Sequence, residues 1–305
     1  MRAIVRKELA DYFSSIRVFI LIILALGISA LALYQASQGI RDSADTEFVF
    51  LNLYTTQLTG NSSNLWLLQY IYLLAIFFIP ILGITLGFDA VNRERITGTL
   101  SRLISQPIYR DNIINAKFIA GLFVIILIVF ASVLLIAGYG VRMIGIPPST
   151  EEIIRLFFFA LMVIIYGAFW MGLSMLFSTL FRNLASSLLT SVGIWLVFGV
   201  FLMFLGDFTG GSINFEQYLM FSRISPSFLF TEAISALLFP YSRGMGIYLE
   251  LIGGGDSINY LMNTPLSLGQ SLTVAWPQFI TIIALTIICF AVSYILFMRQ
   301  EVRST

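Results

Sequence analysis

The chain has 305 residues, of which 58% are hydrophobic and only 11% are charged, and its net charge is +1. Soluble domains carry about 25% charged residues, so most of this surface faces something other than water, and we expect no nucleic-acid partner. The chain has no histidine and one cysteine, Cys289, which excludes a histidine- or cysteine-based metal site and an internal disulfide.

Six apolar runs are each long enough to cross a bilayer, which takes about 20 residues of helix. None of them contains Asp, Glu, Lys or Arg, and they cover residues 18–34, 65–88, 118–139, 156–181, 184–205 and 276–298. The sequence therefore predicts an all-α polytopic membrane protein with six transmembrane helices, built as one domain over residues 1–305.

The segment 1–17 precedes the first span and is basic. It is compatible with a helix whose broad apolar side includes Leu9, Tyr12 and Phe13. We expect an interfacial helix that lies along the bilayer. The alternative is a cleaved signal peptide, which the long apolar run and the lack of a clear A-x-A site disfavour.

The distribution of basic residues predicts the orientation. With the N-terminus in the cytoplasm, the predicted cytoplasmic segments hold twelve Lys and Arg residues and the outer segments hold five. Arg142 and Arg155 count against this layout, but Glu151 and Glu152 lie beside Arg155. The positive-inside rule thus places both termini in the cytoplasm of a multi-pass cell-membrane protein. The predicted outer ends of the spans carry aromatic anchors: Tyr34, Trp66, Tyr139 and Trp276.

Residues inside the spans predict how the helices pack. Pro80 predicts a kink in the second span, and Gly83 with Gly87 forms a small-xxx-small pair that allows close helix approach. Five hydroxyl side chains are expected to form hydrogen bonds between helices: Ser174, Ser178, Thr179, Thr190 and Ser191.

The outer segment 206–275 contains the stretch ISPSFLFTEAISALLFP, which is too short and too interrupted to span. Pro226 and Pro240 bound it, and Ser227 is predicted to cap a helix from Phe228 to Leu238. We expect this helix to lie on the outer membrane face or to cover the outer mouth of a pathway.

The linker 89–117 is basic although it lies between two long apolar runs. A helical reading ends at Pro107 and places four apolar residues on one stripe: Ile96, Leu100, Leu103 and Ile104. Asp111 is predicted to cap a short second helix. Such a basic amphipathic helix docks into a partner or lies at a membrane surface, and we interpret it as a docking element. The alternative is that its arginines only bind anionic headgroups.

Several kinds of chemistry are missing from the sequence. A P-loop needs a lysine followed by Ser or Thr, but the two lysines, Lys7 and Lys117, are followed by Glu8 and Phe118. The six spans also lack the ionisable residues of proton-coupled carriers and the paired carboxylates or activated nucleophiles of intramembrane hydrolases. Any nucleotide that powers this protein must therefore bind another chain.

Three segments resemble one family. ERITGTLSRLISQPIYRDNIINAK resembles the signature after the second span of type-2 ABC exporter permeases, and RKELADYF followed by Arg17 resembles their N-terminal interfacial helix. SPSFLFTEAISALLFP resembles the segment before the last span in the branch that includes the nitrous-oxide-reductase maturation and gliding-motility permeases. The resemblance covers the whole chain.

This resemblance implies a permease subunit that pairs with a second permease chain and docks on a cytoplasmic ATPase, which carries ATP and Mg. The chain itself would then be no enzyme and hold no cofactor. Residues 92–103 would form the coupling helix, in which Gly98 costs about 1 kcal/mol relative to Ala. By this resemblance, the residues expected to bind the ATPase are Asn92, Arg93, Glu94, Arg95, Thr97, Gly98, Thr99, Leu100, Arg102, Leu103, Pro107 and Arg110.

An uncharged pathway suits a lipid-like, amphipathic or apolar substrate. Tyr70, Tyr72, Tyr166 and Trp170 are candidates to contact it, with packing as the alternative role. Two other functions stay open on sequence alone: a secondary transporter or channel that needs no ATPase, and a membrane scaffold or sensor that transports nothing.

Overall fold

The computed structural model describes residues 1–40, 51, 77–96, 98, 109–145, 147–200, 223–238, 240 and 265–299. All regular structure in these ranges is helical, which confirms the predicted all-α membrane fold. The elements are α1 (Arg2–Ser14), α2 (Ile16–Ile40), α4 (Ile79–Gly87), α5 (Asn92–Ile96), α7 (Arg110–Ile144), α8 (Thr150–Leu180), α9 (Leu184–Trp195), the π-helical η3 (Leu196–Val200), α12 (Pro226–Leu238) and α14 (Leu268–Arg299).

Three helices, α7, α8 and α14, are each long and apolar enough to cross a membrane. Within the described ranges, α1 and the first part of α2 provide a fourth candidate if this bent pair counts as one span. The predicted number of six spans stays a prediction, because residues 65–76 and 201–205 lie outside the part that the structure describes. The kink expected at Pro80 is untested for the same reason: Pro80 lies in the first turn of α4.

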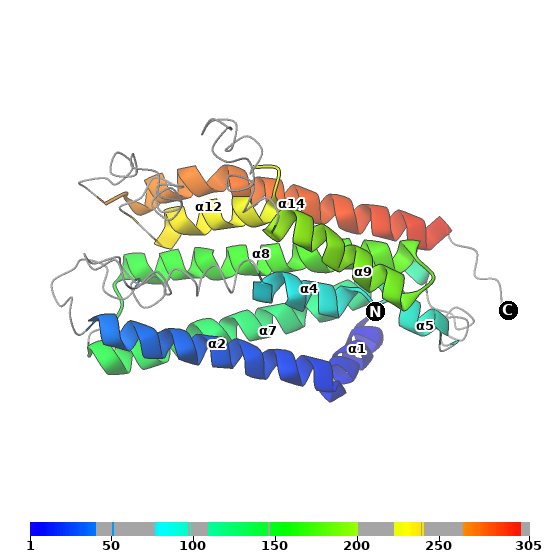
Figure 1. The fold of residues 1–305 in the computed structure, drawn as a ribbon, viewed down its shortest axis with the longest axis horizontal. Coiled ribbons are helices and arrows are strands. Elements are labelled where there is room, and N and C mark those ends of the chain that lie inside the picture. Colours follow the sequence, from blue (N-terminus) through cyan, green and yellow to red (C-terminus); the bar gives the residue numbers. More distant parts are fainter. Residues whose placement is uncertain are drawn as a thin grey trace.

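The centre of the bundle is α8, with α2 and α7 on one side and α12 and α14 on the other (Figure 1). This position explains why α8 buries bulky side chains such as Trp170. Along α4, Gly83 and Gly87 lie against the backbone of α8 and leave no room for a β-carbon. The close helix approach predicted from this glycine pair is therefore confirmed.

Hydroxyl groups join α8 to its neighbours. Ser174 donates to the carbonyl oxygen of Ile84 in α4 (3.1 Å), and Ser191 of α9 donates to Ser174 (3.3 Å). The interhelical role predicted for these serines is confirmed. It is wrong for the hydroxyl of Thr190, which donates to a carbonyl oxygen of its own helix, a local alternative within reach of a threonine. The Thr179 hydroxyl also donates within its own helix, and its interhelical role stays a prediction.

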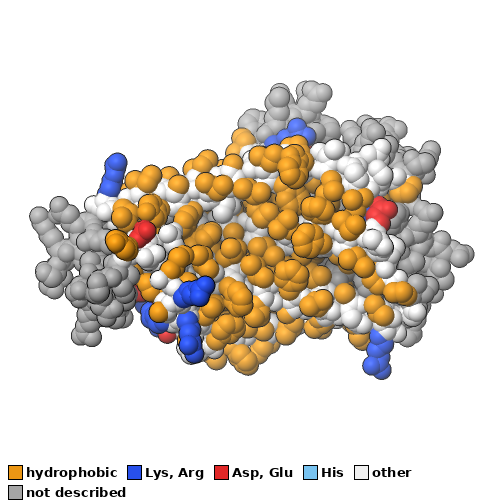
Figure 2. Space-filling view, turned by 180° about the vertical axis from the view of Figure 1, so that it is seen from behind, with side chains coloured by type: hydrophobic (Ala, Val, Ile, Leu, Met, Phe, Trp, Pro, Cys, Tyr) orange, Lys and Arg blue, Asp and Glu red, His pale blue; other side chains and the backbone are white. Residues whose placement is uncertain are grey.

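The two ends of the bundle hold different elements. The N-terminus, α5 and the C-terminal end of α14 lie at one end, here called the α5 end (Figure 1). The turn between α7 and α8, where Gly145 adopts φ +76°, lies at the other, the Gly145 end. This grouping matches the predicted inner and outer segments. Between the two ends, hydrophobic side chains cover most of the visible face (Figure 2).

A sharp bend separates α1 from α2. The two helices meet at Ser15, whose backbone is extended, and their axes differ by 69°. The predicted N-terminal helix is thus present and departs from the direction of the first span. Its location at a membrane surface stays a prediction.

The apolar segment before α14 differs from its prediction. It forms α12, which begins at Pro226, and the hydroxyl of Ser225 rather than Ser227 accepts the N–H of Phe228 (3.3 Å). Nearly every residue of α12 is buried, against α8 and α14. The expectation of a helix lying on the outer membrane face is therefore wrong, because α12 packs between other helices of the bundle. The alternative, that it covers the outer mouth of a pathway, stays a prediction.

Arg155 of α8 holds α12 and α14 together toward the Gly145 end. Its guanidinium is fully buried and donates to the carbonyl oxygens of Leu237 (3.0 Å) and Leu266 (2.7 Å). It also donates to the hydroxyl of Ser271 (2.9 Å) and pairs with the carboxylate of Glu151 (2.8 Å). The charge compensation expected from Glu151 is confirmed, so Arg155 is a core residue and not a loop cation.

Candidate functional site

The basic linker begins at a turn that is fixed to α8 and α9 at the α5 end of the bundle. The hydroxyl oxygen of Ser178 in α8 accepts the backbone N–H groups of Val91 (3.1 Å) and Asn92 (3.2 Å). The hydroxyl of Ser187 in α9 donates to the carbonyl oxygen of Phe88 (3.0 Å). These bonds satisfy the backbone groups that the first turn of a helix leaves open, and they set where α5 starts.

The helix α5 ends at Ile96 instead of continuing to Leu103. Gly98 has φ +67°, a left-handed conformation that cannot belong to a right-handed helix and that glycine adopts at little cost. The prediction of one coupling helix over residues 92–103 is therefore wrong at Gly98. This glycine ends the helix, as glycine commonly does at helix C-termini.

The far end of the linker also differs from its prediction. There is no separate short helix capped by Asp111, because α7 runs without a break from Arg110. Tyr109 occupies the N-cap position without a capping side chain, and Asp111 lies in the first turn, where its carboxylate accepts the N–H of Asn112 (2.9 Å). A carboxylate in that position suits the positive end of the helix dipole.

The predicted docking residues that the structure describes differ in burial. Asn92 and Glu94 are buried, Arg95 is half-buried, and Arg93 and Gly98 are exposed. The side chain of Arg110 and six further residues lie outside the described part: Thr97, Thr99, Leu100, Arg102, Leu103 and Pro107. Their role in docking stays a prediction.

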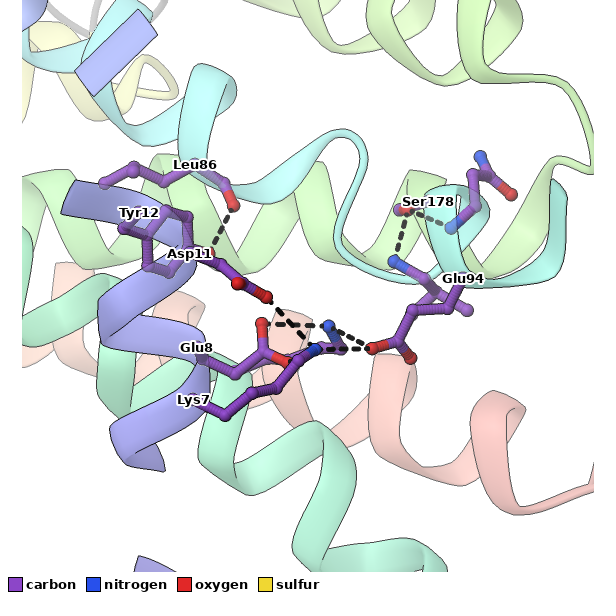
Figure 3. A network of polar contacts seen from close by, with 10 residues as sticks. Lys7, Glu8, Asp11, Tyr12, Leu86, Glu94 and Ser178 are labelled. Carbon is purple, nitrogen blue, oxygen red and sulfur yellow. Dashed lines mark hydrogen bonds and ion pairs between the residues drawn. The ribbon is translucent and has the colours of Figure 1, made fainter. Parts of the chain in front are cut away.

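The inner side of α5 shares a cluster of charges with α1 and α7 (Figure 3). Nζ of Lys117 lies 2.9 Å from the carboxylate of Glu94 and 3.1 Å from that of Glu8. All three side chains are less than 10% exposed. Nζ of Lys7, which is half exposed, lies 2.9 Å from Glu8, 3.2 Å from Asp11 and 3.8 Å from Glu94. We call these five residues the charge cluster.

Burial and the carboxylates of the charge cluster together set the pKa of Lys7, which belongs to the cluster, and of Tyr12, which lies beside it. Partial burial opposes the charge of Lys7, but hydrogen bonds to Glu8 and Asp11 and the nearby Glu94 outweigh it and raise the pKa of Lys7. Burial also raises the pKa of Tyr12, and the carboxylates of the cluster raise it further. Tyr12 is therefore always a hydrogen-bond donor at physiological pH.

Two further contacts attach α1 and the start of α2 to the region before α5. The Tyr12 hydroxyl donates to the carbonyl oxygen of Leu86 in α4 (3.1 Å), and Arg17 pairs with Asp89 (2.8 Å). The Arg17 guanidinium also lies 5.6 Å from the ring centre of Phe88. An N-terminal helix bound in this way is part of the folded bundle, which disfavours the alternative of a cleaved signal peptide.

The side of α5 that faces away from the bundle is exposed. Ile96 is 66% exposed and neighbours the half-buried Arg95, whose guanidinium donates to the carbonyl oxygen of Thr179 (3.4 Å). Burial and the nearby Arg182 lower the pKa of Arg95. Arg93, Ile96 and Gly98 thus form a small surface that is both basic and apolar.

Sequence reasoning missed part of this site. Lys7 and Glu8 were not predicted to belong to it, and Lys117 was grouped with the basic linker although it borders an apolar span. A lysine in that position needs a buried carboxylate partner, and Glu94 is the one acidic residue between Arg93 and Arg110. This need predicts a carboxylate partner for Lys117, but it does not single out Glu94, because Asp89 and Asp111 lie in the same linker.

Two of the four aromatic residues proposed for a substrate pathway lie in the core. Tyr166 and Trp170 are both fully buried in α8. Tyr166 stacks on Phe230 of α12 at 4.3 Å between ring centres and shares a hydrogen bond of 2.7 Å with Ser227. These contacts fit the packing alternative, and substrate contact stays a prediction. Tyr70 and Tyr72 lie outside the described residues.

The sequence as a whole matches one known protein family. Residues 2–302 match the family of ABC-2 family transporter proteins. The chain belongs to the ABC-2 transporter family. Curated proteins gave no match. As an ABC-2 protein, the chain is a membrane component of an ABC transporter and not itself the catalytic part.

Proposed function

We propose that this ABC-2 chain is the permease subunit of an exporter powered by a separate cytoplasmic ATPase, and that α5 with the linker behind it is the docking site of that ATPase. ATP and Mg then bind the partner, since neither lysine of this chain lies in a P-loop. A second permease chain completes the transporter. Both termini lie in the cytoplasm and the spans lie in the cell membrane.

One observation carries this proposal: the two sides of α5 differ. Asn92 and Glu94 anchor its inner side to the bundle, whereas Arg93 and Ile96 are exposed at the end that holds both ends of the described chain. An exposed isoleucine beside arginines is poorly suited to water but well suited to a partner's groove. A helix held on one side and exposed on the other can receive a force and pass it on.

Purification of the tagged chain from its native membranes tests the proposal. We expect an ATPase with Walker motifs to copurify and to hydrolyse Mg-ATP. The variant Ile96→Asp should lower its recovery by about tenfold, the effect of losing a central apolar contact. Ile153→Asp, which changes another exposed isoleucine toward the Gly145 end, is the matched control. Transport by the purified chain without any ATPase would overturn the proposal.

A further inference from the structure

Two buried carboxylates share one buried ammonium group at the α5 end. Glu8 comes from α1, Glu94 from α5 and Lys117 from α7, so three elements distant in sequence meet at Nζ of Lys117. Figure 3 shows the side chains of Glu8 and Glu94 on their two helices. The inner sides of α1 and α5 thus have the same partner atom. Neither helix can move away from α7 without breaking one of these pairs.

Burial makes these pairs strong constraints. A buried carboxylate without a cation is highly unfavourable, and two of them side by side also repel each other. Lys7 contacts both carboxylates as well, but its side chain is half exposed, so water screens its contribution. Lys117 is therefore the member of the charge cluster that holds Glu8 and Glu94 in place.

We infer that Lys117 is a positioning residue that joins α1 and α5 into one moving unit. A displacement of α5 then also displaces α1 and, across Ser15, the start of α2. This inference rests on the proposed function for the origin of the force, which is the docked ATPase. Without Lys117, the remaining ion pairs from α1 and α2 toward α5 would be those of the half-exposed Lys7 and Arg17, which water screens. The start of α2 would then follow α5 less closely.

Distances between spin labels, measured in the chain without its ATPase, test whether Lys117 joins α1 to α5. In a Cys289→Ser background, one label pair at Ala3→Cys and Ile96→Cys reports on α1 and α5, and a reference pair at Tyr139→Cys and Ile153→Cys reports on α7 and α8. All four labelled sites are exposed. Lys117→Met should roughly double the width of the first distance distribution and leave the reference pair unchanged.

Two controls separate positioning from general damage. Lys117→Arg keeps the charge and should keep the narrow distribution. Arg223→Met removes an exposed ion pair with Glu232 of α12, which lies outside α1, α5 and α7, and should also keep it. If Lys117→Met fails to fold, Glu94→Gln removes only the contact to α5 and should broaden the same distribution. An unchanged distribution in the folded Lys117→Met or Glu94→Gln protein would overturn the inference.

Distances measured in the complex with the ATPase test whether the connection through Lys117 transmits motion to α2. Labels at Leu31→Cys in α2 and Ile153→Cys in α8 should shift in distance when ATP and vanadate are added to the wild type. In Lys117→Met, ATPase recovery should stay within about twofold while this shift falls to less than half. An equal shift would overturn the inference. If the wild type recovers no ATPase, the proposed function fails, yet the distances in the chain alone still decide whether Lys117 joins α1 to α5.

Discussion

A β-carbon added to Gly83 of α4 would lie 2.7 Å from the carbonyl oxygen of Gly167 in α8. The backbones of the two helices are therefore in contact, with no side chain between them. Backbone atoms cannot rotate away as a flexible side chain does, so any larger residue at position 83 must push the helices apart.

The first prediction concerns this contact. Gly83→Ala should destabilise the protein by about 1–3 kcal/mol, the usual cost of overpacking. The measurement is the melting temperature of the purified protein in detergent. Gly138→Ala is the control, because a β-carbon there meets nothing within 4 Å and alanine favours the helix. Equal melting temperatures for the two variants would contradict the prediction.

The turn before α5 depends on one hydroxyl oxygen. Ser178→Ala leaves the N–H groups of Val91 and Asn92 without their acceptor, which should cost about 1–3 kcal/mol. Ser14→Ala makes the same chemical change at an exposed site, where water replaces the lost bond. Hydrogen exchange of the 91–96 backbone amides should rise in Ser178→Ala and stay unchanged in Ser14→Ala. Unchanged exchange in both would show that the turn is held by other contacts.

The stability of the protein at the Gly145 end should depend on Arg155. Arg155→Met leaves the carbonyl oxygens of Leu237 and Leu266 buried without a donor, and we expect a loss of about 3–5 kcal/mol. The yield of monodisperse protein and its melting temperature measure this loss. Arg142→Met removes an exposed arginine at the end of α7 and should behave as the wild type. A stable Arg155→Met protein would show that water can replace the guanidinium.

The conformation of Gly98 gives a prediction about the linker. Gly98→Val should disturb it, because a left-handed backbone costs a branched residue about 1–2 kcal/mol, whereas Gly98→Asn should be tolerated. A β-carbon meets nothing within 4 Å there, so the difference reports on the backbone alone. The measurement is ATPase recovery from native membranes, which should fall in the valine variant only. Equal recovery from both variants would contradict it.

Local patterns in the sequence predict the helical fold and the glycine contact between α4 and α8. Apolar runs without charges require helices in a membrane, and Gly83 and Gly87 four residues apart lie on one helix face. The same patterns fail at α5, since the apolar periodicity through Ile96 and Leu100 carries no information on the backbone dihedral angles of Gly98. They also fail to place α12, because an apolar segment with interruptions fits a surface as well as a core.

The charge cluster was beyond local patterns for a different reason. Glu8 and Lys117 are separated by more than a hundred residues, and only the packing of α1 against α7 brings them together. Sequence indicates that a lysine bordering a span needs a carboxylate partner, but it does not select Glu8 and Glu94 from the available acids.

The contacts of Arg155 also bear on which substitutions the protein can absorb. Among its partners are two main-chain oxygens, those of Leu237 and Leu266, and such an oxygen is present whatever side chain the residue carries. Exchanges at positions 237 and 266 therefore leave the guanidinium contacts available, provided that the new side chain fits. These contacts instead require arginine at position 155, because no other amino acid offers five donors in one plane.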